Sequence, residues 1–518
     1  MALFHDDDKG EKKEAIIIRS KIGIIGAGVS GIAAAKQLRQ HNPIVFEATD
    51  SIGGVWRHCS FNSTKLQSQR RDYEFTDYPW PNNRDNSDFP THLEILDYLH
   101  SYAHHFDILK TISFNSKVLH IRFLGSHARP LWHLAVQNTL SNTIQWYGFE
   151  FVVICIGKYG DVAQIPAFPR SKGPETFKGK VLHTLDYCKL NHQEATQLFK
   201  GKNVAVVGFK KSAIDLAMEC ALANQGCEGQ RCTMVVRTAH WTVPHYWVWG
   251  LPLSMFYTNR SSQFLHERPN QGFLKTLLTL LLSPMRRGMS KFIESYLLWK
   301  LPLEKYGLIP DHSFDEDYAS CQMAILPENF FSEAEKGKIA FKKASSKWWF
   351  WEGGIEFDDN TKLEADVVVL ATGYDGKQKL NSIMEEPFRS LLDYPSASGV
   401  MPLYRGTIHP LIPNMAFLGY VESVANLHSS EIRSLWLSAL LDQKFMLPTV
   451  PDMLAHTLEE VEVMKRTSRF YKRHCISTYS INHTDQICHD LGWTSWRKNN
   501  WLAEAFSHYS SEDYQNQH

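Results

Sequence analysis

The amino-acid sequence predicts an α/β protein built from two dinucleotide-binding, Rossmann-like domains, one of them inserted into the other. Two strand–glycine turn–helix patterns start near Lys21 and near Asn203. Two further apolar strands that run into a glycine, 151–158 and 367–374, flank the second pattern. A nucleotide-binding unit bracketed in this way interrupts another unit, which indicates an inserted domain.

Composition places the chain among globular enzymes. Its 518 residues suit about two or three domains of ~100–200 residues each. With 43% hydrophobic residues, 12% aromatic residues and zero formal net charge, no nucleic-acid partner is indicated. Nine scattered cysteines, an odd number, predict core thiols without a disulfide framework and a reducing, cytoplasmic compartment. Residues 1–18 are expected to form a disordered tail, because Met1–Glu14 lacks the apolar stretch of a signal peptide.

The first glycine motif is a complete nucleotide signature. A predicted strand at 21–25 is followed by Gly26-Ala27-Gly28-Val29-Ser30-Gly31, a helical pattern at 32–40, a strand at 43–46 and the acid Glu47. Gly26 makes the tight turn, Gly28 admits a pyrophosphate, and Gly31 lets helix and strand pack closely. Glu47 is expected to accept hydrogen bonds from ribose hydroxyls, and the phosphates are expected at the positive end of the helix.

The second motif, Gly208-Phe209-Lys210-Lys211-Ser212-Ala213, has lysine in place of its middle glycine. A decayed site, an unrelated turn and a working site with altered chemistry are all open at this point. The next strand, Thr233–Arg237, ends in arginine rather than an acid, and a guanidinium suits the 2′-phosphate of NADP. Lys210 and Lys211 either supply charge for the lost backbone contact or lie in solvent. We predict a working NADP site with altered detail.

The most apolar run of the chain, Phe273–Met285, is too short for the ~20 residues that a membrane-spanning helix needs. It contains Lys275 and is followed by Arg286 and Arg287. Two interpretations remain, a buried or interfacial segment, and association of residues 273–287 with a membrane surface.

A family resemblance begins after Glu47, where the chain continues with Gly53-Gly54-Val55-Trp56. An acid followed by Gly-Gly-x-Trp resembles the FAD-binding segment of flavin-containing monooxygenases. Residues 177–187 match the F-x-G-x-x-x-H-x-x-x-Y pattern of that family, with His183 and Tyr187 as its last two members. The resemblance implies FAD at the first motif, with Gly53, Gly54 and Trp56 among its contacts, and NADPH at the second. The NADP domain would then be inserted into the FAD domain. No C-x-x-C pair is present, which argues against the disulfide reductases.

Five stretches make the chain similar to the plant subfamily that N-hydroxylates pipecolic acid in systemic immunity. They are residues 65–81, 208–217, 245–252, 404–420 and 469–477, within a resemblance that spans 19–514. It implies that NADPH reduces FAD, that the reduced flavin captures dioxygen as a C4a-hydroperoxide, and that the nitrogen of a small cyclic amino acid attacks that oxygen. The alternatives are S-oxygenation of thioethers and a nucleotide sensor without turnover.

Catalytic and substrate-binding residues are less defined, because in such enzymes the cofactor carries the difficult chemistry. Gln67, near the family's active-site asparagine, His183 and Tyr187 are the catalytic candidates. Tyr187, where Baeyer–Villiger enzymes carry tryptophan, favours oxygenation of a heteroatom. A substrate carboxylate needs a cation, and Arg70, Arg71 and Arg405 lie in the resembling stretches. No metal site and no transmembrane segment are expected, and the oligomeric state is left open.

The expected domain boundaries follow from these motifs. They are a tail at 1–18, the first part of the FAD domain at 19–170, the NADP domain with the apolar run at 171–330, and the second part of the FAD domain with C-terminal helices at 331–518.

Overall fold

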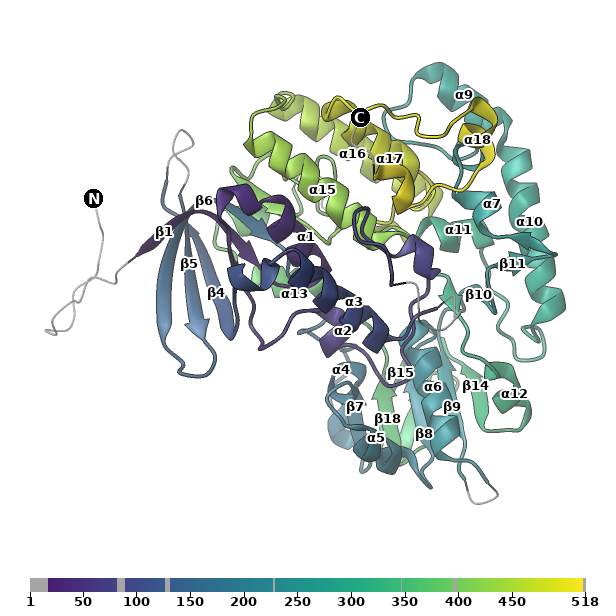
Figure 1. The fold of residues 1–518 in the computed structure, drawn as a ribbon. Coiled ribbons are helices and arrows are strands. Elements are labelled where there is room, and N and C mark those ends of the chain that lie inside the picture. The colour runs from purple at the N-terminus through teal and green to yellow at the C-terminus, as the bar shows by residue number, and fades with distance from the viewer. Residues whose placement is uncertain are drawn as a thin grey trace, which may run out of the picture.

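The computed structural model describes residues 17–81, 89–125, 131–226, 229–345, 347–394 and 398–515. Two mostly parallel sheets, each carrying one glycine motif, lie beside a helical region (Figure 1). This architecture confirms the predicted α/β fold class with two Rossmann-like domains. Of the predicted tail, residues 1–16 fall outside the described part of the chain, and Ile18 already belongs to the first strand.

The first sheet carries the first glycine motif and has the strand order β3-β2-β1-β6-β5-β4, with β19 paired to β6. Its strands are β1 (Ile18–Ile25), β2 (Ile44–Phe46), β3 (Ile112–Ser113), β4 (Ser116–Phe123), β5 (Trp132–Asn138), β6 (Ile144–Ile154) and β19 (Met415–Phe417). The strands β1, β2, β3, β6 and β19 are parallel, whereas β4 and β5 extend the sheet in antiparallel fashion. Residues 22–25 of β1 are all buried, as in a strand covered on both faces.

The second sheet carries the second motif and is parallel throughout, in the order β14-β9-β8-β18-β7. Its strands are β7 (Lys180–His183), β8 (Val204–Val207), β9 (Cys232–Val236), β14 (Ile339–Lys343) and β18 (Val367–Leu370). Because β14 and β18 come after residue 330, the expected boundary at 330/331 is corrected, and the inserted domain extends to Leu370. Long-range pairing of β18 between β7 and β8 decides this, and a local strand pattern cannot show it.

The chain passes between the two domains twice, and the two passages are hydrogen-bonded to each other. The Gln164 N–H donates to the Gly373 carbonyl at 2.9 Å, and the Asp375 N–H donates to the Val162 carbonyl at 2.9 Å. The apolar run 151–158 is therefore where the chain leaves the first sheet, and the run 367–374 is where it leaves the second sheet and returns to the first domain. Gly373 has φ +90°, which favours glycine at this turn.

Helices cover both sheets. The longer ones are α1 (Val29–Gln37), α3 (His92–His105), α5 (His192–Phe199), α6 (Lys211–Ala223), α15 (Asn426–Leu441), α16 (Val450–Thr467) and α17 (Ser480–Asp490). Shorter ones are α2 (Val55–His58), α4 (Thr184–Tyr187), α12 (Phe330–Glu335), α13 (Gly376–Asn381), α14 (Phe388–Leu391) and α18 (Trp501–Phe506). Helix α1 packs against α15, and its residues 30–35 are all buried. A small antiparallel sheet of β15 (Trp348–Trp351), β16 (Gly354–Phe357) and β17 (Lys362–Glu364) precedes β18.

Residues 241–325 of the inserted domain form a separate helical region beside the C-terminal helices (Figure 1, teal and yellow). Its elements are α7 (Ser254–Tyr257), α8 (Arg260–Gln263), α9 (Phe273–Leu281), α10 (Ser283–Lys300), α11 (Phe314–Ala319), and the short strands β10 (Thr242–Val243), β11 (Trp247–Val248), β12 (Leu251–Pro252) and β13 (Ala324–Ile325). The Arg260 guanidinium donates to Asp485 of α17 and Glu504 of α18, which ties this region to the end of the chain.

The expectation that the apolar run 273–285 forms a buried segment is wrong. Of the nine residues of α9, only Thr279 is buried. Among the described residues, no helix has both the length and the apolar character to cross a bilayer.

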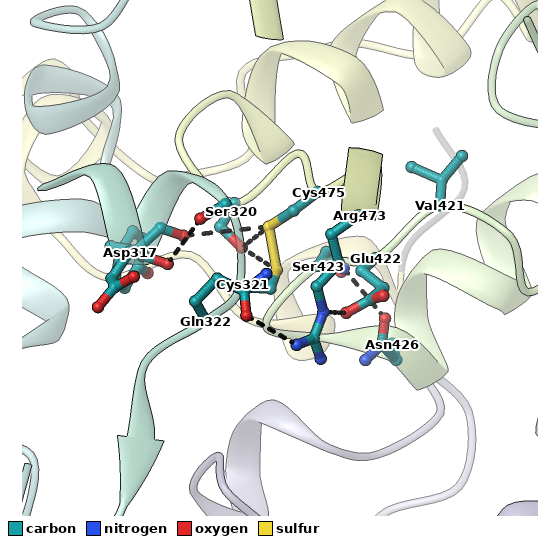
Figure 2. The surroundings of a disulfide bond; sticks show 12 residues. Asp317, Ser320, Cys321, Gln322, Val421, Glu422, Ser423, Asn426, Arg473 and Cys475 are labelled. Carbon is teal, nitrogen blue, oxygen red and sulfur yellow. Dashed lines mark hydrogen bonds and ion pairs between the residues drawn. A yellow bond between two sulfur atoms is a disulfide. The ribbon is translucent and has the colours of Figure 1, made fainter. Parts of the chain in front are cut away.

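One disulfide joins Cys321 to Cys475, a pair that the expectation of scattered core thiols without a disulfide framework did not include (Figure 2). The other described cysteines are free: Cys59, Cys155, Cys188, Cys220, Cys232 and Cys488. The bonded pair is 154 residues apart in sequence, so only the packing of the helical region against the C-terminal part brings the two thiols together.

Candidate cofactor and substrate sites

The turn after β1 has the geometry that the first glycine motif needs. Gly26 has φ +98°, a conformation that L side chains rarely adopt. A Cβ on Gly31 would lie 1.8 Å from the Gly26 carbonyl oxygen, so only glycine lets α1 start this close to the turn. Gly28 is the N-cap residue of α1, and Val29 and Ser30 open the helix. The unpaired N–H groups of this first turn form the kind of site that binds phosphate.

Glu47 lies directly beside this turn, at the end of β2. Its Oε2 accepts a hydrogen bond from the Ala27 N–H at 2.7 Å, and its Oε1 accepts from the N–H and hydroxyl of Thr49 at 3.0 and 2.9 Å. A carboxylate has about four lone-pair sites, so one stays available to a ribose hydroxyl. The carboxylate is buried and held rigidly, as a group that orients a ligand must be.

The Gly-Gly-x-Trp segment closes over the same turn. The Gly53 N–H donates to the Ala27 carbonyl at 3.1 Å, and a Cβ on Gly28 would lie only 3.5 Å from the Cα of Gly54. The half-buried Trp56 donates its indole N–H to the Tyr73 hydroxyl at 2.8 Å. The two glycine segments, which the sequence separates by more than twenty residues, thus form one backbone surface.

The second motif has kept the shape of a nucleotide turn despite its lysine. Gly208 has φ +140°, and a Cβ there would lie 2.6 Å from the Ala371 carbonyl oxygen. Phe209 is buried, and Lys210 is the N-cap residue of α6 in an extended conformation. Ser212 and the buried Ala213 lie in the first turn of the helix. The backbone therefore presents a helix N-terminus at the end of β8, as in the first domain.

Cations gather at this edge of the second sheet. β8 and β9 are parallel with Val207 opposite Val235, so Lys210 and Arg237 follow neighbouring strands at the same edge. The Lys210 side chain reaches solvent, but the surrounding protein desolvates its ammonium and lowers its pKa to about 8. The positive charges of Arg473 and Arg237 lower this pKa further. The negative charges of Glu422 and Asp317 act in the opposite direction. Arg237 is exposed and has no hydrogen bond or ion pair with another described residue. Two uncommitted cations at a helix N-terminus fit a phosphate-rich ligand.

An ion cluster around the buried Glu422, beside this motif, was missed from the sequence. Glu422 Oε2 accepts from Arg473 Nε at 2.8 Å (Figure 2), and its Oε1 lies 2.6 Å from the Nζ of Lys158. Burial alone would raise the pKa of the Glu422 carboxyl, but Arg473 and Lys158 outweigh burial and lower it to about 2. The cluster holds Arg473 close to Lys210. Its only signals in the sequence were the lysine after Gly157 and the resemblance at 469–477.

His183 and Tyr187, the candidates from the F-x-G-x-x-x-H-x-x-x-Y pattern, are both buried. His183 Nδ1 accepts from the Leu185 N–H at 3.1 Å and caps α4. The Tyr187 hydroxyl donates to Glu219 of α6, which also accepts from the Ser63 N–H at 2.9 Å. Burial raises the Tyr187 pKa, with Glu219 adding to the rise. Tyr187 therefore helps to join the two domains through Glu219, whereas His183 caps α4, and both side chains are buried.

Gln67 joins the first domain to the helical region. Its side-chain oxygen accepts from the Ile325 N–H at 3.3 Å, and its backbone carbonyl accepts from the Tyr246 hydroxyl. Tyr246 also lines a small cavity. The cavity is lined by Gln69, Arg71, Asp72, Tyr246, Trp247, Pro252, Leu253, Ser254, Thr258, Tyr318 and Val424.

Only one of the three candidate arginines lies at this cavity. Arg70 donates to Glu94 at 2.7 Å and stacks on Trp80, and Arg405 donates to Asp490 at 2.7 and 3.1 Å. Arg71 is exposed, donates to the neutral Gln69 amide at 2.9 Å and pairs with no described carboxylate. Of the three, Arg71 alone is therefore placed to receive a substrate carboxylate.

Three buried groups near the second motif are close enough to hold a metal ion, namely His240, His312 and Asp317. His240 Nδ1 and His312 Nε2 each lie 2.8 Å from Asp317 Oδ1, and the Trp241 N–H donates to Oδ2 at 2.6 Å. These are hydrogen-bond distances, so the carboxylate is satisfied by protein groups alone. The cluster anchors β10 to α11.

Comparison with known proteins identifies the family of the chain. Residues 19–495 match the family described as "Flavin-binding monooxygenase-like". The chain is 65% identical over 511 residues to "Probable flavin-containing monooxygenase 1" of Arabidopsis thaliana, covering 96% of both chains. It is 56% identical to "Putative flavin-containing monooxygenase 2" of the same plant over 488 residues, which cover 91% of this chain and 97% of that one.

Two solved structures share the fold at lower identity. An oxidized steroid monooxygenase bound to NADP superposes with a TM-score of 0.64 at 19% identity, over 91% of this chain and 97% of that one. S-allyl-L-cysteine S-oxygenase from Allium sativum superposes with a TM-score of 0.57 at 19% identity, over 92% and 90% of the two chains.

Proposed function

The chain belongs to the flavin-binding monooxygenase-like family, and on that premise we propose that it N-hydroxylates a small cyclic amino acid, converting pipecolate to N-hydroxypipecolate. As an NADPH-dependent flavin monooxygenase it uses FAD and NADPH as cofactors. We further propose that it acts in the cytoplasm in plant systemic immunity, which the resemblance of residues 65–81 and 469–477 to that subfamily supports.

The observation that carries the proposal is the position of Arg71. An amino-acid substrate brings a carboxylate, and a guanidinium holds a carboxylate through two parallel hydrogen bonds. Arg71 is the candidate that offers such a guanidinium at a cavity wall. The other arginines of the resembling stretches are already paired with Glu94 and Asp490.

The protein's part in the reaction is to bind and orient. FAD supplies the oxygen-transferring chemistry when it is bound, and NADPH supplies the electrons. The first turn of α1, from Gly28 to Gly31, would offer backbone N–H groups to one pyrophosphate, and Glu47 would hold the adjoining ribose. Lys210 and Arg237 would hold the phosphates of the second nucleotide. Arg71 would bind the substrate carboxylate at the cavity wall and leave the ring nitrogen free to react.

S-oxygenation of a thioether is the second candidate function. The Allium protein is named for oxygenating S-allyl-L-cysteine, which is also an amino acid, so Arg71 would serve a sulfur-containing substrate equally well. Sulfur and a deprotonated secondary amine are both nucleophiles toward electrophilic oxygen. Assay with both substrate types distinguishes the two functions.

Incubation of the purified protein with FAD, NADPH, oxygen and pipecolate tests the proposal. We expect a product heavier by one oxygen atom, identified by mass spectrometry as the N-hydroxy acid, with NADPH consumed in step with product. S-Methylcysteine serves as the thioether comparison. If pipecolate gains no oxygen while the thioether is oxidised, the S-oxygenation alternative replaces the proposal and the family assignment stands.

A further inference from the structure

Helix α9 is amphipathic in the opposite sense to an ordinary surface helix. A surface helix of a globular protein turns its apolar stripe to the core and its polar face to water. In α9 the one buried residue is the polar Thr279, which is 5% exposed, whereas Phe273 and Leu274 are 80% and 78% exposed. Six of its eight exposed side chains are apolar, and the other two are Lys275 and Thr276. We call the exposed set Phe273, Leu274, Leu277, Leu278, Leu280, Leu281 and Met285 the apolar ridge.

Exposed apolar side chains also lie on α10, which follows α9 directly, and on α18. Phe292, Leu298 and Trp299 of α10 are also exposed. On α18, Trp501, Leu502 and Phe506 are exposed, and Arg260 of α8 donates to Glu504 of α18. Figure 1 shows α9 at the edge of the molecule, with α18 below it in that view. The exposed apolar side chains of α9 and α10, two helices in contact with each other, form the kind of surface that marks an interaction site.

The charge around the ridge identifies the partner. Residues 272–300 contain five cations and a single acid, Glu294. Glu294 is buried, accepts from the Ser290 hydroxyl and the Phe314 N–H, and pairs with Lys291, so it offers no free charge to solvent. Lys275 and Arg287 are exposed beside the leucines. Cations interspersed with leucine and phenylalanine complement a surface with an apolar layer beneath anionic headgroups.

We propose that the apolar ridge docks on an anionic lipid surface. α9 lies in the plane of that surface with its leucines among the acyl chains, while Lys275, Arg287 and Lys300 contact the headgroups. At nine residues α9 is far below spanning length, so the docking is peripheral. The proposal concerns attachment alone and holds whichever substrate the enzyme oxygenates. A second copy of this chain is a poor occupant, because two such ridges would bring their cations face to face.

Vesicle co-sedimentation of the full chain tests the docking. Vesicles of phosphatidylcholine with and without phosphatidylserine are compared, using the parent protein and the triple variant Phe273→Ser/Leu274→Ser/Leu281→Ser. We expect the parent to sediment with the phosphatidylserine vesicles. The affinity of the triple variant for these vesicles should fall by at least about tenfold. The charge variant Lys275→Glu/Arg287→Glu should lose the preference for phosphatidylserine.

Leu140→Ser is the matched control, because Leu140 is 77% exposed in the turn after β5 and lies on the other domain. It should bind vesicles like the parent. FAD content and melting temperature show that every variant is folded. The proposal is overturned if the parent stays in the supernatant with both vesicle types or if the triple variant sediments as the parent does. A dimer by light scattering that the triple variant converts to monomer, without vesicle binding, would instead assign the ridge to self-association.

Discussion

The Nζ of Lys211 lies 2.6 Å from Oδ1 of Asp215 on the same helix, so the two adjacent lysines of the second motif have different surroundings. Asp215 is buried, and burial raises its pKa to about 6 although Lys211 opposes the rise. Lys211 therefore neutralises a carboxylate inside the protein. Lys210 has no such partner among the described residues, which leaves its ammonium for a ligand.

This difference predicts a pH dependence of NADPH binding. Because the pKa of Lys210 is lowered to about 8, its charge is present below that pH and is lost above it. The KM for NADPH should therefore rise as pH increases through about 8, by up to about tenfold per pH unit. Lys210→Arg stays charged and should abolish the rise. Steady-state kinetics across this range measure the effect.

Lys211→Ala is the comparison. It should lower the melting temperature, because Asp215 is left buried without its partner, and should change the KM for NADPH much less than Lys210→Ala does. Equal loss of NADPH affinity in the two alanine variants, or a flat pH profile for the parent, contradicts the assignment.

Arg237→Ala should impair NADPH more than NADH. A charge-assisted contact with the 2′-phosphate is worth about 1.5–3 kcal/mol, or roughly ten- to more than a hundredfold in KM. NADH lacks that phosphate, so its KM should change little. The ratio of kcat/KM for the two cofactors is the measurement, and an equal loss with both would remove Arg237 from the 2′-phosphate site.

Alanine variants of Gly31 and Gly28 in the first motif should have different defects, one in stability and the other in FAD binding. In Gly31→Ala the new Cβ would lie 1.8 Å from the Gly26 carbonyl oxygen, so the backbone must move and the protein should lose stability by about 1–3 kcal/mol or more. In Gly28→Ala the nearest atom, Cα of Gly54, is 3.5 Å away, an ordinary contact. That variant should keep the melting temperature of the apoprotein and lose FAD, because the methyl group occupies the approach of the pyrophosphate.

Absorbance at the flavin band and thermal melts of the FAD-free protein separate the two effects. The interpretation of the first motif fails if Gly28→Ala is purified with a full complement of FAD.

Arg71→Gln should raise the KM for pipecolate by about tenfold or more and leave the KM for NADPH unchanged, if Arg71 holds the substrate carboxylate. Arg70→Gln is the matched control. It removes the 2.7 Å contact with Glu94 and the stacking on Trp80, so it should lower the melting temperature and leave the substrate KM near the parent value. Unchanged pipecolate kinetics in Arg71→Gln would exclude Arg71 from the substrate site.

Loss of the disulfide should lower stability. Cys321→Ser removes a cross-link between residues 154 apart, which stabilises a protein by about 2–4 kcal/mol in typical cases. The melting temperature of the parent should fall in the presence of a reductant, and that of Cys321→Ser should not respond. Peptide mapping without reduction should recover the Cys321–Cys475 peptide pair. A parent that melts identically with and without reductant would show that the bond does not stabilise the folded protein in solution.

Local sequence patterns were enough to predict those parts of the fold that depend on the backbone geometry of a few consecutive residues. The turn at Gly26, the acid at Glu47 and the strand before Gly208 each depend on a few consecutive residues with fixed backbone requirements. Both glycine motifs lie where the pattern predicted, after β1 and after β8. The insertion of one domain into the other was also visible, because the two strands that run into glycine mark its ends.

The sequence by itself thus determined the fold class, the two nucleotide turns and the family, because each of them depends on short motifs of consecutive residues. Only the tertiary structure decided the extent of the second sheet, the Cys321–Cys475 bond, the commitment of Lys211 to Asp215, and the position of Arg71 at a cavity. It also decided that the apolar residues of α9 face outward around a buried Thr279. These features depend on which distant segments pack together and on which charges find partners there, and no periodicity within a single segment carries that information.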